Sequence, residues 1–143
     1  MALDKVVYTA HAVATGGREG TAKTNDGKLD VKLDPPKEMG GHGNGTNPEQ
    51  LFAAGYAACF IGSIKFLAGT RKIHVPVDTA INSSVSFGPR AGGAKGFGID
   101  VALEVHIPGM DLAAAEELVH EAHEVCPYSN ATRNNIDVTI NVV

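Results

Sequence analysis

One long apolar segment limits what this chain can fold into more than any other feature. It opens with Asn47 as an N-cap, Pro48 at the first helical position and Gln50 completing a capping box. The residues that follow are apolar nearly all round a helix until Lys65, and the pattern continues to about Gly69. A helix without a polar face has to be buried. The segment therefore predicts a central helix that other elements enclose.

The remaining segments predict strands and one further helix. Residues 5–13 are rich in strand formers, and Asn25-Asp26-Gly27 favours a tight hairpin between two more strands. Asp111 caps a second helix over residues 112–125, and Pro127 disfavours further helix beyond it. Alternation or strand-forming composition predicts the other strands, near 79–87, 96–107 and 136–142. The order βββ-α-ββ-α-β belongs to the α+β class, and the length suits a single domain over residues 1–143.

Composition and charge exclude several classes of protein. The chain has 143 residues, a net charge of −4 and a pI of about 5.8, which argue against a general binder of nucleic acids or anionic membranes. Its start lacks the basic and apolar regions of a signal peptide. The longest uncharged apolar run, 51–64, is shorter than the roughly 18 residues that a membrane span needs. We therefore expect a cytoplasmic protein.

The two cysteines, Cys59 and Cys126, have unlike surroundings. Cys59 lies deep in the apolar helix, whereas Cys126 ends the second helix. Free cysteine is among the most buried residue types, so packing alone could account for both. In the cytosol a pair of thiols is more often catalytic, redox-active or inert than a permanent disulfide. The residues alone leave open whether the two thiols react, as nucleophile and resolver, or pack.

Two rival chemistries are weaker. His120 and His123 lie three residues apart on one helical face and Cys126 continues the row, a spacing that can hold zinc. However, histidines among glutamates on a helix are usually solvated, and the sequence fixes no fourth ligand. The glycine-rich loop 41–45 resembles a phosphate-binding loop, but no Gly-Lys-Ser/Thr follows it. We therefore expect no bound metal and no bound nucleotide.

Three blocks of sequence resemble one protein family. They are NPEQLFAAGYAACF at residues 47–60, VCPYSNATR at 125–133 and GGREG at 16–20. Their order and spacing resemble those of the organic hydroperoxide resistance proteins of the OsmC-like superfamily, over essentially the whole chain. Tyr128, after Cys-Pro, resembles the organic hydroperoxide branch rather than the general OsmC branch. Asn134 departs from the pattern, because relatives often carry glycine there, and we expect only a small effect on a loop.

The resemblance implies a thiol peroxidase that reduces organic hydroperoxides. It implies that Cys59 is the peroxidatic cysteine and Cys126 the resolving one, with Arg18 and Glu49 as the activating pair. It also implies an intertwined homodimer with two active sites at the subunit interface. The implied reductant is a dithiol of the dihydrolipoyl type, carried on lipoylated enzyme subunits, rather than a bound flavin or metal.

A reactive cysteine in an apolar helix needs a nearby cation. The thiolate is the nucleophile, and burial of Cys59 raises its pKa by desolvation. The guanidinium of Arg18 can hold a thiolate and a carboxylate together, and Glu49 can supply that carboxylate. Each residue also has a plainer interpretation. Arg18 suits an ordinary solvated arginine, and Glu49 suits a charge that complements a helix N-terminus.

Aromatic residues near the two thiols are candidates for contact with the substrate, although core packing is the simpler interpretation: Phe52, Tyr56, Phe60 and Tyr128. An apolar surrounding of Cys59 favours bulky alkyl or fatty-acid hydroperoxides over hydrogen peroxide. Two alternative functions stay open. One is a general OsmC-type peroxidase with looser substrate choice, and the other is a non-catalytic redox-sensing or ligand-binding member of the fold.

The spacing of Glu49 and Cys59 bears on which subunit supplies each residue. They are ten positions apart, which is about 15 Å along a helix axis. A glutamate side chain cannot span that distance, so the pair cannot cooperate within one unbroken helix. Unless Gly55 breaks the helix, we expect composite sites in a dimer. Both cysteines would come from one chain, and the Arg18–Glu49 pair from its mate.

Overall fold

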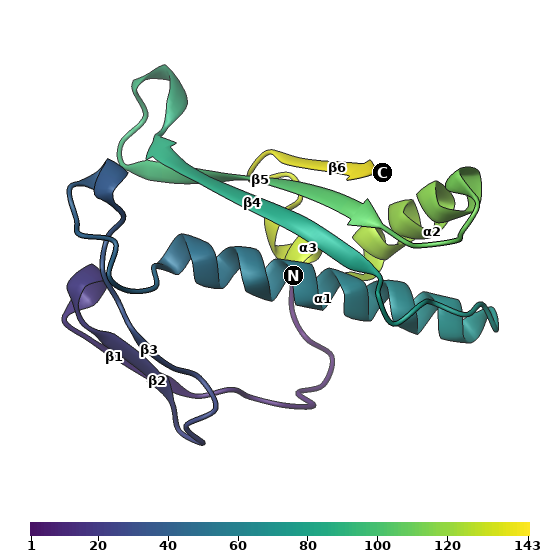
Figure 1. Cartoon of the computed structure of the whole chain (residues 1–143), viewed down its shortest axis with the longest axis horizontal. Coiled ribbons are helices and arrows are strands. Elements are labelled where there is room, and N and C mark those ends of the chain that lie inside the picture. The colour runs from purple at the N-terminus through teal and green to yellow at the C-terminus, as the bar shows by residue number, and fades with distance from the viewer. The chain divides into compact units, whose positions relative to one another are not determined.

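The computed structural model describes all residues from 1 to 143 and divides the chain into two compact units, residues 1–48 and 49–143. It confirms the α+β class and the predicted order of strands and long helices, with one short helix added (Figure 1). That the two units act as one domain stays a prediction. The elements are β1 (Ala12–Thr15), β2 (Thr21–Thr24), β3 (Asp30–Lys32), α1 (Pro48–Thr70), β4 (Ala80–Pro89), β5 (Phe97–His106), α2 (Leu112–Val125), α3 (Pro127–Thr132) and β6 (Val138–Val142).

The unit of residues 1–48 is a three-stranded antiparallel sheet of order β1-β2-β3. The prediction of a strand over residues 5–13 is wrong in its bounds, because β1 begins only at Ala12. Val6, Val7 and Tyr8 lie outside any strand and are exposed. A run of strand formers becomes a strand only where a neighbouring backbone completes its hydrogen bonds. β2 pairs with residues 12–15, which share only Ala12 and Val13 with this run.

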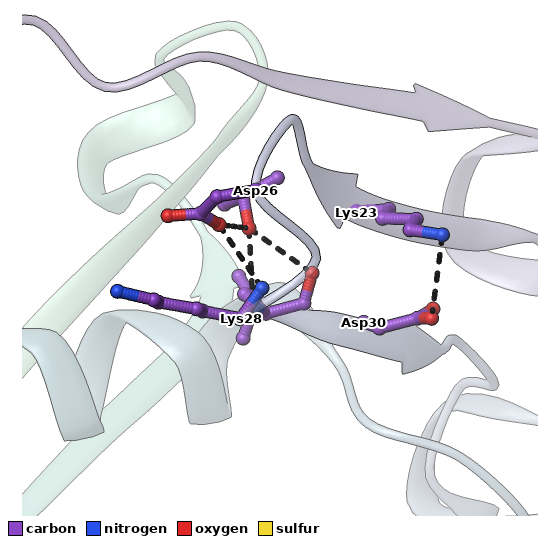
Figure 2. A network of polar contacts seen from close by, with 6 residues as sticks. Lys23, Asp26, Lys28 and Asp30 are labelled. Carbon is purple, nitrogen blue, oxygen red and sulfur yellow. Dashed lines mark hydrogen bonds and ion pairs between the residues drawn. The ribbon is translucent and has the colours of Figure 1, made fainter.

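The predicted hairpin between β2 and β3 is confirmed, and Figure 2 shows the polar contacts of its turn. The Asp26 carboxylate accepts a hydrogen bond of 2.7 Å from the Thr24 hydroxyl and one of 3.0 Å from the Lys28 N–H. Gly27 has the positive φ, 72°, that the Asp-Gly pair predicted. Beyond the turn, Lys23 and Asp30 form an exposed ion pair of 3.8 Å.

The unit of residues 49–143 is built on a second sheet, of order β4-β5-β6. β4 and β5 form a long antiparallel hairpin that pairs Ala80 with His106 at one end and Pro89 with Phe97 at the other. β6 runs parallel to β5, so the chain has to cross over between them, and it does so through α2 and α3. This crossover brings the end of α2 into the same core as α1.

α1 packs on the sheet through one face rather than on all sides. Its fully buried residues are four apart, Tyr56, Phe60, Ile64 and Ala68, and they share a core with one face of β5 and with α2. Phe66, on the opposite face, is 63% exposed. The predicted central helix thus enters the core through one face, and one sheet and α2 of this chain cover only part of its surface.

By length and composition alone, α1 is also apolar enough to cross a membrane. That is weak evidence of a span, because the core helix of a soluble protein has the same composition and α1 has one face in the core.

Two local features of the second half depend on special residues. Asp111 caps α2 as predicted, accepting a hydrogen bond of 3.2 Å from the Ala114 N–H. The expectation of no helix after Cys126 is wrong, because Pro127 begins α3. A proline suits a first helical position, where its missing N–H is not needed. Asn134 has a φ of 63°, a left-handed conformation that glycine and asparagine tolerate.

Candidate functional site

The structure brings the two cysteines together. Cys59 lies mid-way along α1, and Cys126 is the junction residue between α2 and α3, with φ −62° and ψ 124°. The Cys126 thiol donates to Cys59 Sγ across 3.7 Å. Cys126 is completely buried and Cys59 is half-buried. Both thiols are free, and a disulfide needs an S–S distance of about 2.05 Å. The two sulfurs therefore have to approach from 3.7 Å to about that distance before they bond.

The surroundings of Cys59 shift its pKa in opposing directions. Burial raises the pKa of the thiol above its ordinary value, and the neighbouring Cys126 adds to the rise. The backbone N–H of Tyr128 lowers the pKa, because it donates a hydrogen bond to the sulfur. The net shift is upward, as the sequence predicted for a thiol in an apolar helix. A thiolate at this position therefore needs further stabilisation from a cation.

A group of hydrogen-bonded side chains adjoins the thiol pair, and we call it the helix-junction network: Tyr56, His123, Ser129 and Thr132. Tyr56 Oη lies 2.8 Å from Ser129 Oγ and 3.1 Å from Thr132 Oγ1. Ser129 Oγ lies 2.8 Å from His123 Nδ1. The sequence alone did not reveal this network. The available signal was position, since His123 and Ser129 each stand three residues from Cys126.

Arg133 fixes the same junction from the end of α3. Its Nη1 donates a hydrogen bond of 2.9 Å to the carbonyl of His123, and its Nη2 donates to the side chain of Asn130. One guanidinium thus joins the last turn of α2 to α3. The junction that carries Cys126 is therefore held by side-chain hydrogen bonds on both of its helices.

The four aromatic candidates form one cluster beside the thiols. The ring of Tyr128 lies 5.7 Å from that of Phe52 and 5.5 Å from that of Tyr56, measured between centroids. Tyr56 and Phe60 are completely buried, whereas Phe52 and Tyr128 keep exposed surface. Tyr128 also lies over Gly55, where an added Cβ would be 2.7 Å from the tyrosine hydroxyl. The Tyr128 ring can lie here because residue 55 is a glycine and has no side chain.

Arg18 lies in the turn Gly17–Glu19 that joins β1 to β2, and its side chain is half-buried. The turn depends on Gly20, because a Cβ there would lie 1.7 Å from the carbonyl oxygen of Thr15. The local sequence is glycine-rich because the backbone at Gly20 packs closely against the backbone of Thr15 and Gly16. Arg18 is thus presented by a tight, specific turn.

Glu49 lies in the first turn of α1, ten residues before Cys59. Gly55 does not break the helix, which is continuous from Pro48 to Thr70. Ten residues of unbroken helix keep Glu49 about 15 Å along the axis from Cys59. The structure therefore joins Cys59 to Cys126 and separates Glu49 from Cys59 within one chain.

The row His120, His123 and Cys126 is not arranged as a metal site. No group of three or more metal-ligating side chains is placed to hold an ion. Cys126 is directed to Cys59, and His123 to Ser129. His120 and His123 instead line a groove of about 420 Å³ between α2 and β6.

Comparison with known proteins identifies the family. The model of the OsmC-like protein family matches residues 41–141. The chain belongs to the OsmC-like family, in its organic hydroperoxide resistance branch. An organic hydroperoxide resistance protein of Xanthomonas axonopodis pv. citri is 59% identical over 96% of this chain and 95% of its own length. The organic hydroperoxide resistance protein OhrB of Bacillus subtilis is 43% identical over 94% of this chain and 96% of its own.

A solved structure agrees with this assignment. The crystal structure of an organic hydroperoxide resistance protein from Legionella pneumophila has a TM-score of 0.89 and 51% identity, and the match covers 96% of this chain and 98% of that one. The OsmC-like fold and branch that the three sequence blocks predicted are thereby confirmed.

Proposed function

We propose that this OsmC-like protein is a cysteine-based peroxidase that reduces organic hydroperoxides to alcohols. The observation that carries the proposal is the pair of free thiols 3.7 Å apart, in a chain whose relatives are organic hydroperoxide resistance proteins. A thiol pair at this distance can donate two electrons to a peroxide from within one chain, because the two thiols are oxidised to a disulfide. No other group of side chains in the structure offers a comparable redox reaction.

The reaction takes place in two steps. The Cys59 thiolate attacks one peroxide oxygen, the O–O bond breaks, and the alkoxide takes a proton to leave as an alcohol. Cys59 is then a sulfenic acid. The Cys126 sulfur attacks Cys59 Sγ, the S–O bond breaks, and the hydroxyl group leaves as water with the Cys126 proton. The product is a Cys59–Cys126 disulfide. This second step protects Cys59 from sulfinic acid, which is usually irreversible.

The disulfide has to be reduced for a second turnover. We propose a dithiol of the dihydrolipoyl type, carried on lipoylated enzyme subunits, which becomes a cyclic disulfide as it returns two thiols to the enzyme. No cofactor bound to the enzyme takes part in this scheme. A cytoplasmic location suits it, because reduced thiols persist there.

The substrate proposed is an alkyl or fatty-acid hydroperoxide. Phe52 and Tyr128 have exposed surface next to the thiols, and an alkyl group that covers it gains about 25 cal/mol per Å². Tyr56 packs against both rings from within the core, and Phe60 packs against Tyr56. Hydrogen peroxide has no alkyl group and gains nothing from this surface.

Activation of Cys59 is proposed to come from a second copy of the chain. The raised pKa of Cys59 calls for a cation, and Arg18 with its partner Glu49 would supply it. Because α1 is unbroken, Glu49 cannot reach Cys59 of its own chain. We therefore propose a homodimer with composite sites. In each site both cysteines belong to one subunit, and the Arg18–Glu49 pair to the other.

Consumption of cumene hydroperoxide with dihydrolipoamide as the reductant tests the proposal. The wild type should turn over, Cys59→Ser should lose the first turnover, and Cys126→Ser should keep it but accumulate over-oxidised Cys59. Full activity in Cys59→Ser would exclude the mechanism. Comparable kcat/KM for hydrogen peroxide would point to a general OsmC-type peroxidase. Oxidation without turnover in excess dithiol would point to a redox sensor.

A further inference from the structure

The junction that carries Cys126 is closed by a hydrogen bond between residues on either side of it. His123 stands three residues before Cys126, in the last turn of α2, and Ser129 stands three residues after it, in α3. His123 Nδ1 and Ser129 Oγ are 2.8 Å apart. Cys126 itself has an extended backbone, outside both helices. The angle between α2 and α3, and with it the position of the Cys126 sulfur, is therefore constrained by this contact.

The same serine ties the junction to the helix that carries Cys59. Tyr56 stands three residues before Cys59 on α1, and its hydroxyl lies 2.8 Å from Ser129 Oγ. Both residues are completely buried, so their hydroxyl groups have no water as an alternative partner. The thiol pair joins α1 to the α2–α3 junction, and the hydroxyl pair joins α1 to α3, with the two contacts three residues apart on each side.

A count of protons gives the direction of each hydrogen bond. Thr132 donates to the carbonyl oxygen of Ser129 at 3.3 Å, a usual bond for a helical threonine. Tyr56 then donates to Thr132 Oγ1, which has no second proton to give. Ser129 in turn donates to Tyr56. With that proton used, the 2.8 Å contact to His123 requires Nδ1–H as the donor. His123 is therefore assigned the Nδ1-protonated tautomer.

We propose that His123 is a positioning residue for the resolving step. Through Ser129 and Tyr56 it holds the Cys126 sulfur within reach of Cys59, and its Nδ1–H is the donor that completes the helix-junction network. The inference rests on the proposed peroxidase function. His123 does not touch either sulfur or the substrate in this scheme. It acts by setting where Cys126 stands when Cys59 becomes a sulfenic acid.

The charge state of His123 agrees with this role. Burial lowers its pKa, Arg133 and His120 lower it further, and Glu124 opposes them. His123 is therefore neutral at neutral pH, and one ring proton has to be assigned to one nitrogen. The Nδ1–H bond to Ser129 is also present in the protonated ring, so acid does not remove it.

Positioning can be measured because the sulfenic acid of Cys59 has two competing fates. Attack by Cys126 gives a disulfide and water, whereas attack on a second hydroperoxide gives a sulfinic acid and an alcohol. A displaced Cys126 slows the first reaction and leaves the second unchanged. The fraction of sulfinic acid formed per turnover therefore reports the position of Cys126, and the rate of the first oxidation does not.

The test compares three variants during turnover of cumene hydroperoxide, with sulfinic acid measured by mass spectrometry. His123→Leu should raise the sulfinic fraction about threefold to tenfold, as expected for the loss of one hydrogen bond, with an unchanged first oxidation. His123→Asn should stay near the wild-type value, because its amide N–H can replace Nδ1–H. His120→Leu is the matched control, since His120 lines the same groove without belonging to the network. A wild-type fraction in His123→Leu would overturn the proposal.

A measurement on the wild type covers the case in which His123→Leu does not fold. Nitrogen-15 NMR of the His123 ring should find the proton on Nδ1, and a proton on Nε2 would overturn the assigned network. Different outcomes exclude the proposed function and the role of His123. A wild type that forms no Cys59–Cys126 disulfide removes the proposed function. A wild type that forms it, with a wild-type sulfinic fraction in His123→Leu, removes only the role of His123.

Discussion

The two units of this chain differ in how much of their structure they bury. In residues 1–48 only Leu33 and Asn47 are buried, and the strand formers at residues 6–8 are exposed. Residues 49–143 hold the hydrophobic core, both thiols and the helix-junction network. The pair of thiols is thus built into a well-packed unit, whereas Arg18 belongs to a thin sheet with little core of its own. In the proposed mechanism the redox pair therefore lies within one subunit, whereas the activation of Cys59 depends on assembly of the dimer.

Mixing two inactive variants tests most strongly whether Arg18 of one subunit activates Cys59 of the other. Cys59→Ser and Arg18→Ala subunits should each be inactive alone. In a composite site, a mixed dimer has one site with both defects and one intact site. With random subunit exchange, half the dimers are mixed and activity should return to about a quarter of the wild-type value. The measurement is peroxide consumption after exchange has been verified by mass spectrometry, and no recovery would show that each site comes from one chain.

Truncation of the core should affect stability far more than a surface change in the first unit. Phe60→Ala removes a completely buried ring and should lower the free energy of unfolding by about 3–5 kcal/mol. Lys23→Ala removes the exposed ion pair with Asp30 and should cost no more than about 1 kcal/mol. Urea denaturation measures both values. Similar losses in the two variants would contradict the contrast in burial between the units.

Gly20→Ala should impair the activation of Cys59 and leave the Cys59–Cys126 pair able to form its disulfide. An added Cβ meets the Thr15 carbonyl oxygen at 1.7 Å, so the turn that presents Arg18 has to change. We expect kcat/KM for cumene hydroperoxide to fall about a hundredfold, the scale of a 1 Å misplacement. Disulfide formation by diamide, which needs no Arg18, should be unchanged. Gly69→Ala, where a Cβ meets nothing within 4 Å, is the control. Loss of disulfide formation in Gly20→Ala would show that the two units do not act separately.

Some features of the fold and of the site could be predicted from the sequence, and others could not. The sequence predicted the start of α1, the hairpin at Gly27 and the cap at Asp111, because each depends on a few neighbouring residues. It placed Cys59 and Cys126 in one site only through the family resemblance. It missed α3 because a proline after a helix also suits the start of the next one. The helix-junction network could not be predicted, since it joins residues 73 positions apart, Tyr56 and Ser129.

A smaller effect is expected on the pH at which the Cys59 thiol becomes reactive. In the structure its pKa is raised, mainly by burial, so the protonated thiol is favoured and the thiolate forms only as pH rises past that raised value. Arg18 supplied by a partner would oppose the shift. Alkylation of Cys59 by iodoacetamide, in a Cys126→Ser background, should therefore need a higher pH in Arg18→Ala than with Arg18 present. Identical pH profiles would show that Arg18 does not stabilise the thiolate.

The central claim is that the two thiols of residues 49–143 form one redox pair, and a single titration tests it most directly. Reduced wild-type protein is treated with one equivalent of cumene hydroperoxide and digested without reducing agent, and its peptides are identified by mass spectrometry. The account predicts a disulfide between the peptides of Cys59 and Cys126, in protein that migrates as a single chain under denaturing conditions. A disulfide between two chains, or full consumption of peroxide with both thiols still free, would contradict it.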